Sequence, residues 1–140
     1  MSYEEHIRMA EKYRIRFSDD ELKSPQILHQ FTGAEFAAEV FPEYTDVEIM
    51  NAISCHTTGK RSMTMLDKLL YIADYIEPLR THTSCVALRE KFYSKLNESN
   101  KERLLDEIIL ESLEMTKKHL EDKNLPVHPL TLAAIEQLKK

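Results

Sequence analysis

The scarcity of glycine is the feature that most constrains how this chain can fold. It has 2 glycines among 140 residues, where average usage would give roughly ten. Tight β-hairpin turns, phosphate-binding P-loops and Gly-rich dinucleotide-binding loops all depend on glycine. The sequence therefore argues against all-β folds, P-loops and Rossmann-type dinucleotide-binding folds. Together with the helix signals along the chain, it predicts an all-α fold built from short helices.

Size, charge and cysteine content further limit the kinds of protein that this chain can be. A chain of 140 residues with 42% hydrophobic side chains can bury one core, so residues 1–140 are expected to form a single helical domain. No apolar run is long enough for a membrane span, and no leader pattern is seen. A net charge of −5 argues against electrostatically driven nucleic-acid binding. Cys55 and Cys85 form no C-x-x-C motif and are expected to be reduced thiols in a cytoplasmic protein.

Capping residues and helix breakers divide the chain into segments. Ser2 with Glu5 and Thr32 with Glu35 have capping-box spacing, Asp46 and Thr64 can cap further helices, and prolines interrupt the pattern. The expected helices cover 3–13, 32–41, 47–56, 65–77, 84–96, 100–122 and 129–140, with a short apolar turn at 26–29. In the fourth of these, apolar residues at helical spacing are expected to face the core: Leu66, Leu69, Leu70, Ala73 and Ile76.

Three ionisable residues lie beside apolar neighbours in this pattern. On a helical wheel, Asp74 falls about 40° from Leu70, and His29 and His56 each lie at the end of an apolar segment. Two imidazoles and a carboxylate suit a first-row transition metal. The spacing alone favours the alternative, satisfied core histidines and an ion-paired aspartate, because no compact motif such as H-E-x-x-H is present.

A second candidate site follows His56 directly. Thr57, Thr58, Gly59, Lys60 and Arg61 could bind phosphate together with Arg80. The alternative is a plain helix stop at Thr-Thr-Gly followed by solvated basic residues. Of the other histidines, His6 and His119 are expected at the surface, and His82 and His128 in turns or caps.

Longer motifs resemble a known family. The segments NAISCHTTG at 51–59 and MLDKLLYIADYIEPLR at 65–80 are similar to those of the bacterial HD-domain hydrolases of the YqeK type. Leu28-His29 before Thr32-Gly33-Ala34-Glu35 and Val127-His128-Pro129-Leu130-Thr131 add to the likeness. The resemblance implies a compact helical bundle of the HD-domain type, with two metals, that cleaves dinucleoside tetraphosphates symmetrically into two nucleoside diphosphates.

The resemblance also implies roles for individual residues. His29, His56 and Asp74 match metal ligands, with His56 and Asp74 expected to be catalytic and iron the expected metal. The residues expected to bind substrate are Thr57, Thr58, Gly59, Lys60, Arg61 and Arg80. Asp67 and Glu77 are expected to orient ligands.

The family pattern places an early histidine and an adjacent His-Asp pair upstream of His29, and this sequence contains no His-Asp dipeptide. Met1 is therefore expected to correspond to an internal position of an N-terminally incomplete domain.

Two other functions stay open at this point. One is a non-catalytic helical module that binds a nucleotide or a protein partner through Gly59, Lys60 and Arg61. The other is a different HD-type nucleotidase. The expected partner is a nucleotide substrate, a dinucleoside polyphosphate, without nucleic acid or membrane, and a homodimer is a further expectation.

Overall fold

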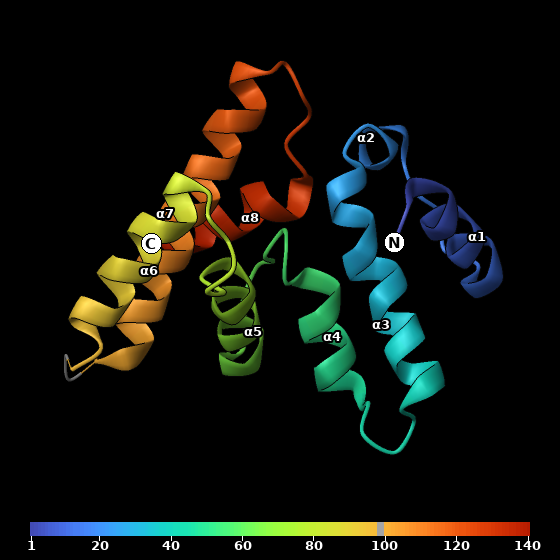
Figure 1. Ribbon diagram of the computed structural model, residues 1–140, viewed down its shortest axis with the longest axis horizontal. Helices are drawn as coiled ribbons and strands as arrows, with labels where there is room; N and C mark the ends of the chain where they lie inside the picture. The colour runs from blue at the N-terminus through green and yellow to red at the C-terminus, as the bar shows by residue number, and fades with distance from the viewer. Residues whose placement is uncertain (98–99) are drawn as a thin grey trace.

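Helices account for every regular element in the part of the chain that the computed structural model describes, residues 1–97 and 100–140 (Figure 1). The elements are α1 (Tyr3–Tyr13), α2 (Asp19–Leu22), the 3-10 helix η1 (Pro25–Ile27), α3 (Leu28–Val40), α4 (Val47–Cys55), α5 (Met65–Tyr75), α6 (Thr83–Lys95), α7 (Lys101–Asp122) and α8 (Pro129–Leu138). The all-α prediction is confirmed.

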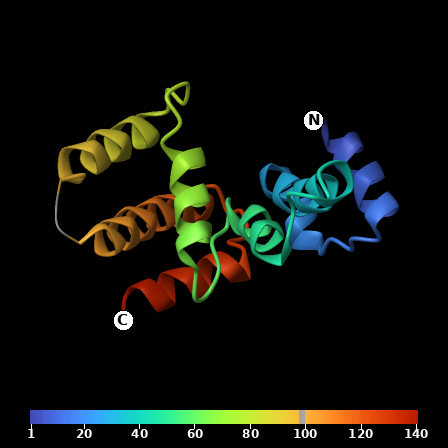
Figure 2. The ribbon, with the colours of Figure 1, turned by 90° about the horizontal axis from the view of Figure 1, so that it is seen from below.

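The helices follow one another in space largely as they do in sequence. Helix α3 packs against α1 on one side and α4 on the other, and α5 lies between α4 and α7. Helices α6 and α8 both pack against α7, and the two ends of the chain lie at opposite sides of the molecule (Figures 1 and 2). Among the described residues, no helix has the length and apolar character needed to cross a bilayer.

The main core is formed by α5 to α8. Its fully buried members include Leu104, Ile108, Ile109 and Leu113 on α7, which also contact α8 through Ala134. Burying one such aliphatic side chain contributes roughly 1.5–3 kcal/mol. Because α7 contributes most of these side chains, it is the central element against which α5, α6 and α8 are held.

Local capping explains most of the helix starts. Ser2 with Glu5 and Thr64 with Asp67 form the two-way hydrogen bonds of capping boxes, and Asp46 caps α4 through the amide of Ile49. These three starts are as predicted. A further capping box, Ser18 with Glu21, begins α2, a helix that is absent from the prediction.

The predicted helix start at Thr32 is wrong. Helix α3 begins at Leu28, directly after η1, so Thr32 lies inside the helix and is fully buried. Its hydroxyl is 3.2 Å from the carbonyl of Leu28 one turn earlier and 2.9 Å from Nδ1 of His6. His29 therefore belongs to the first turn of α3 and does not precede a helix.

The predicted buried face of α5 is also wrong. The residues that α5 buries are Asp67, Lys68, Tyr71 and Ile72, whereas Leu66 and Leu69 are 39% and 49% exposed. Only Ile76 of the expected set is fully buried. Helix α5 is apolar on two faces, and its packing between α4 and α7 decides which one enters the core.

Candidate functional site

Two histidines from neighbouring helices meet at the centre of the candidate site. His29 lies in the first turn of α3, and His56 follows the last residue of α4. Their Nε2 atoms are 2.8 Å apart, and the two rings pack edge to face. Both side chains are half-buried. The packing of α3 against α4 therefore brings together two imidazoles that are 27 positions apart in sequence.

Backbone contacts orient both rings. Nδ1 of His56 is 2.6 Å from the carbonyl oxygen of Ile53, and because a carbonyl only accepts, this nitrogen carries the proton. When the ring carries only that proton, Nε2 presents its lone pair toward His29. Burial, followed by the charge of His56, lowers the pKa of His29, against the opposing effects of a hydrogen bond to the Gln26 backbone and of Asp74. His29 is thus biased toward the neutral, ligating form.

This arrangement suits a metal ion. Two uncharged rings that face each other through nitrogen lone pairs repel unless a cation or a proton lies between them. Two nitrogen ligands at about 2.1 Å from an ion that meet near a right angle are separated by about 3 Å, close to the 2.8 Å observed. Within the described residues, however, no group of three or more His, Cys, Asp or Glu side chains forms a metal site.

The third predicted ligand, Asp74, is held elsewhere. Its carboxylate is 2.5 Å from Nη2 of Arg80, and both side chains are about 40% exposed. Its charge nevertheless acts to raise the pKa of His29. The structure thus brings His29 and His56 together and leaves Asp74 paired with Arg80, so its role as a ligand stays a prediction.

The turn after α5 positions Arg80. Glu77, expected to orient a ligand, accepts a hydrogen bond from the amide of Leu79 at 3.0 Å. Arg89 of α6 donates to the carbonyls of Ile76, Glu77 and Arg80 at distances of 2.8, 2.5 and 2.8 Å. No local sequence pattern marks Arg89, because its role depends on contacts between separate elements.

The Thr-Thr-Gly segment ends α4. Gly59 has a φ of +66°, and its amide donates to the carbonyl of Cys55. Gln30, fully buried in α3, accepts hydrogen bonds from the amides of Thr57 and Thr58 at 3.1 and 3.2 Å and donates to the Thr58 hydroxyl. Thr58 and Gly59 are buried, so their contacts support the helix-stop alternative. Thr57 alone of the three reaches His29, with its hydroxyl 3.3 Å from Nε2.

Gln30 is a second residue that sequence reasoning missed. It adjoins His29 in the sequence, but its hydrogen-bond partners lie 27 and 28 positions away. No local pattern marks such a contact.

The basic residues after Gly59 also have partners. Lys60 lies 2.8 Å from the carboxylate of Asp67, whose side chain is 1% exposed, and Arg61 forms an exposed pair with Glu136 at 2.6 Å. Burial would raise the pKa of Asp67, but hydrogen bonds from Lys60 and from the Thr64 backbone outweigh it and keep the pKa below its ordinary value. Asp67 therefore caps α5 and binds Lys60. Among the described residues, no hydrogen bond joins it to His29, His56 or Asp74, so its role in orienting a ligand stays a prediction.

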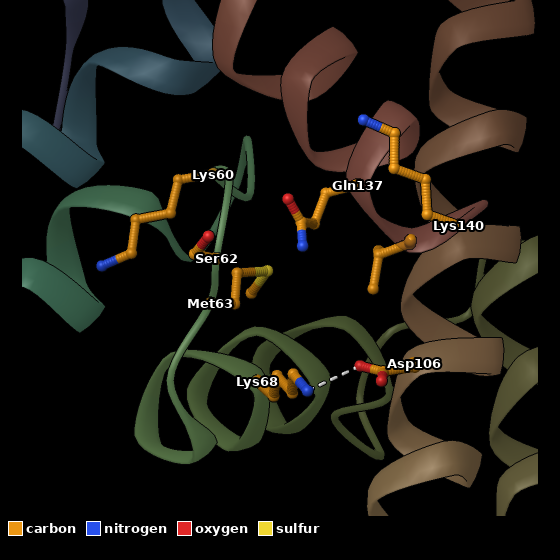
Figure 3. A pocket seen from close by; sticks show the side chains of 8 residues that line it. Lys60, Ser62, Met63, Lys68, Asp106, Gln137 and Lys140 are labelled. Carbon is orange, nitrogen blue, oxygen red and sulfur yellow. Dashed lines mark ion pairs between the residues drawn. The ribbon is translucent and has the colours of Figure 1, made fainter.

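A separate polar pocket lies between the segment 60–63, α5, α7 and α8. Its volume is about 220 Å³, and neither His29 nor His56 lines it. Figure 3 shows Lys68 paired with Asp106 across the pocket, while the ammonium group of Lys60 points out of it. Because carboxylates already neutralise these lysines, the pocket is a poor site for phosphate.

Two further histidines have structural contacts. His6, expected at the surface, is 6% exposed and lies against Thr32, so that expectation is wrong. His128 caps α8 through the amide of Leu130, as predicted, and also meets Glu21 at 3.1 Å.

The sequence of this chain is similar to those of three bacterial proteins that share one name. The chain is 36% identical to the symmetrical bis(5'-nucleosyl)-tetraphosphatase of Halalkalibacterium halodurans over 124 residues, which are 89% of this chain and 58% of the relative. It is 34% identical to the protein of the same name from Bacillus subtilis and 37% identical to that of Staphylococcus aureus, covering 77% and 76% of this chain and 53% and 51% of those relatives. The chain thus spans about half the length of the curated relatives it matches.

A solved structure is also similar to this chain. The crystal structure of a predicted HD superfamily hydrolase involved in NAD metabolism from Clostridium acetobutylicum matches with a TM-score of 0.80 and 30% identity. The match covers 99% of this chain and 68% of that one. No family model matches the chain. From the extent of this structural and sequence likeness, the chain belongs to the HD superfamily.

Proposed function

We propose that this chain contributes to a metal-dependent phosphohydrolase that cleaves dinucleoside tetraphosphates symmetrically into two nucleoside diphosphates. The observation that carries the proposal is the pairing of His29 with His56 through their Nε2 atoms at 2.8 Å. The names of the three curated relatives support the substrate class.

In this proposal His29, His56 and Asp74 supply half of the ligands of a dinuclear site, with iron as the metal. Such ions lower the pKa of bound water and stabilise the attacking and leaving oxygens. Ile53 and Gln26 hold the imidazoles in place from the backbone side. Asp74 joins them by leaving Arg80, which an exposed ion pair permits at little cost.

Arg80 then has a role of its own. Its guanidinium can bind a phosphate in the same planar, two-pronged way that it binds a carboxylate. Arg89 fixes the backbone on which it is mounted. Arg61 can join it, since its pair with Glu136 is exposed, whereas Lys60 is committed to the buried Asp67.

The proposal is tested by the products formed from diadenosine tetraphosphate. The iron-loaded protein is expected to yield ADP as the sole nucleotide product, and His56→Ala and Asp74→Asn to yield none, with His119→Ala as a control at an exposed position. Formation of ATP with AMP, or equal ADP formation by wild type and His56→Ala, would contradict it. A preference for mononucleotides would instead support a different HD-type nucleotidase.

The alternative of a non-catalytic module bound through Gly59, Lys60 and Arg61 has less support. Gly59 is buried, and the two cations pair with Asp67 and Glu136. Partner binding that persists in His56→Ala, in the absence of hydrolysis by wild type, would favour that alternative.

A further inference from the structure

One buried side chain joins the two segments that carry the histidine pair. Gln30 follows His29 in α3 and is 0% exposed. Its Oε1 accepts hydrogen bonds from the backbone amides of Thr57 and Thr58 at 3.1 and 3.2 Å, and Thr57 is the residue after His56. The sequence neighbour of one candidate ligand is therefore bonded to the sequence neighbour of the other, across 27 positions.

The partners of the Gln30 amide group fix its orientation. A backbone N–H only donates, so the atom that faces the amides of Thr57 and Thr58 is the oxygen of the side chain. The nitrogen then donates to the hydroxyl of Thr58 at 3.1 Å, and that hydroxyl donates to the carbonyl of Gly59 at 2.9 Å. Gln30 therefore uses both ends of its amide group to bind the turn that ends α4.

Each imidazole is oriented mainly by its own segment. Nδ1 of His56 meets the carbonyl of Ile53 in α4, and His29 bonds to the backbone of Gln26. The packing of α3 against α4 sets the positions of the two helices, but His56 lies beyond the last residue of α4. Metal ligands have to be held to within about 0.5 Å of the productive geometry. A contact from α3 to the turn itself is needed for that precision, and Gln30 supplies it.

We propose that Gln30 is a positioning residue that bonds the turn after α4 to α3 and so holds His29 and His56 at the separation that a metal ion requires. The inference rests on the proposed function, in which these two histidines are ligands. Gln30 acts through the amides of Thr57 and Thr58 and is not itself a ligand. Its expected effect is therefore on the affinity for the metal and on the geometry of the bound ion.

Anaerobic titration with Co²⁺ tests this role, because the visible bands of the ion report ligand geometry and the titration reports affinity. Gln30→Leu keeps a buried side chain of similar size but offers no acceptor to the two amides. It is expected to bind Co²⁺ at least about tenfold more weakly than wild type, with shifted bands. Gln30→Glu keeps an oxygen that can accept from both amides and is expected to restore the wild-type bands and most of the affinity.

Leu104→Ala separates positioning from a general loss of stability. Leu104 is 2% exposed in the first turn of α7 and belongs to the core formed by α5 to α8. Its truncation should lower the melting temperature because it leaves a cavity in that core, while the folded protein keeps the wild-type Co²⁺ affinity and bands. An equal loss of affinity in Leu104→Ala and Gln30→Leu would overturn the inference, as would wild-type affinity and bands in Gln30→Leu.

Hydrogen exchange in the wild-type protein, followed by NMR, covers the case in which Gln30→Leu does not fold. If Gln30 holds the turn in advance, the amides of Thr57 and Thr58 are protected from exchange in the metal-free protein as they are in the Zn²⁺-loaded protein. Free exchange of both amides until Zn²⁺ is added would show that the metal and not Gln30 orders the turn. Co²⁺ binding by Gln30→Glu that is as weak as binding by Gln30→Leu would also contradict the role.

The same titration distinguishes failure of this inference from failure of the proposed function. If Co²⁺ binding requires His56 but is the same in wild type and Gln30→Leu, the positioning role fails and the proposed function stands. If His56→Ala binds Co²⁺ as well as wild type, the proposed function fails, and the positioning role fails with it.

Discussion

The two glycines of this chain are expected to respond in opposite ways to alanine. Gly59 has a φ of +66°, and a Cβ there would lie 3.2 Å from Cβ of Ala134 and 3.5 Å from a methyl group of Leu113. Gly33 lies inside α3, where a Cβ would meet only Cγ2 of Ile53, at an ordinary 3.8 Å. The first position is both strained and crowded for alanine, and the second is neither.

The magnitudes follow from these two environments. A left-handed conformation costs a non-glycine residue about 1–2 kcal/mol, and crowding in a packed core adds about 1–2 kcal/mol. Gly59→Ala should therefore lower the free energy of unfolding by about 2–4 kcal/mol, which for a chain of this length is roughly 7–14 °C in melting temperature. Gly33→Ala should raise it by about 0.5–1 kcal/mol through helix propensity.

Thermal and urea unfolding followed by circular dichroism at 222 nm measures both variants against wild type. Gly59→Asn separates the two costs, because asparagine tolerates a positive φ but still carries the crowded Cβ. If Gly59→Ala unfolds like wild type and weakens only phosphate binding, Gly59 belongs to a phosphate loop, and the assignment of Thr57 to Gly59 as a helix stop is refuted.

Other positions test the packing. Lys60→Met leaves the buried Asp67 carboxylate unpaired and should cost about 3 kcal/mol. The ordinary pKa of an aspartate is about 3.9, and the folded-state pKa of Asp67 lies below it. The ionised carboxylate therefore stabilises the wild-type fold fully above about pH 3.9, and this stabilisation is lost as the pH falls through the folded-state pKa. The variant should unfold at a higher pH than wild type in an acid titration. Burial, aided by the charge of Asp67, raises the pKa of the Cys55 thiol to about 12, so native protein at pH 8 should leave Cys55 unlabelled by iodoacetamide in peptide mapping, and rapid native-state labelling would contradict this. In urea unfolding, Ile72→Ala should lower the free energy of unfolding by about 3 kcal/mol and Leu69→Ala by less than about 0.5 kcal/mol. The reverse order would show that the face of α5 with Leu69 is the one that packs in the core.

Local signals in the sequence predicted where helices begin better than they predicted how the helices pack. The capping boxes at Ser2 and Thr64 act through hydrogen bonds within three residues, so their effect can be read from sequence. Thr32 has the same spacing to Glu35, but η1 had already started the helix at Leu28, and the threonine instead bonds back to that residue. A capping pattern thus predicts a start only where no preceding turn supplies one.

Tertiary contacts explain what the sequence could not settle. Leu69 and Ile72 are equally apolar, and only the position of α7 buries the second and leaves the first exposed. His6 looked like a surface residue among charged neighbours, but the approach of α1 to α3 buries it against Thr32.

In the candidate site too, the sequence marked single residues, whereas their contacts appear only in the structure. The sequence singled out His29 and His56, and the structure adds their meeting through Nε2. The pairing of Asp74 with Arg80 joins residues that are only six positions apart, but it depends on the turn that Arg89 holds, so no helical period indicates it.

Metal binding by the histidine pair tests the central claim most directly. Anaerobic titration of the purified chain with Co²⁺, followed by the visible ligand-field bands that imidazole ligation produces, reports coordination without reference to activity. Wild type and His119→Ala are expected to give the same bands, and His29→Ala or His56→Ala to bind at least about tenfold more weakly. Equal binding by wild type and a His29→Ala/His56→Ala double variant would contradict the account.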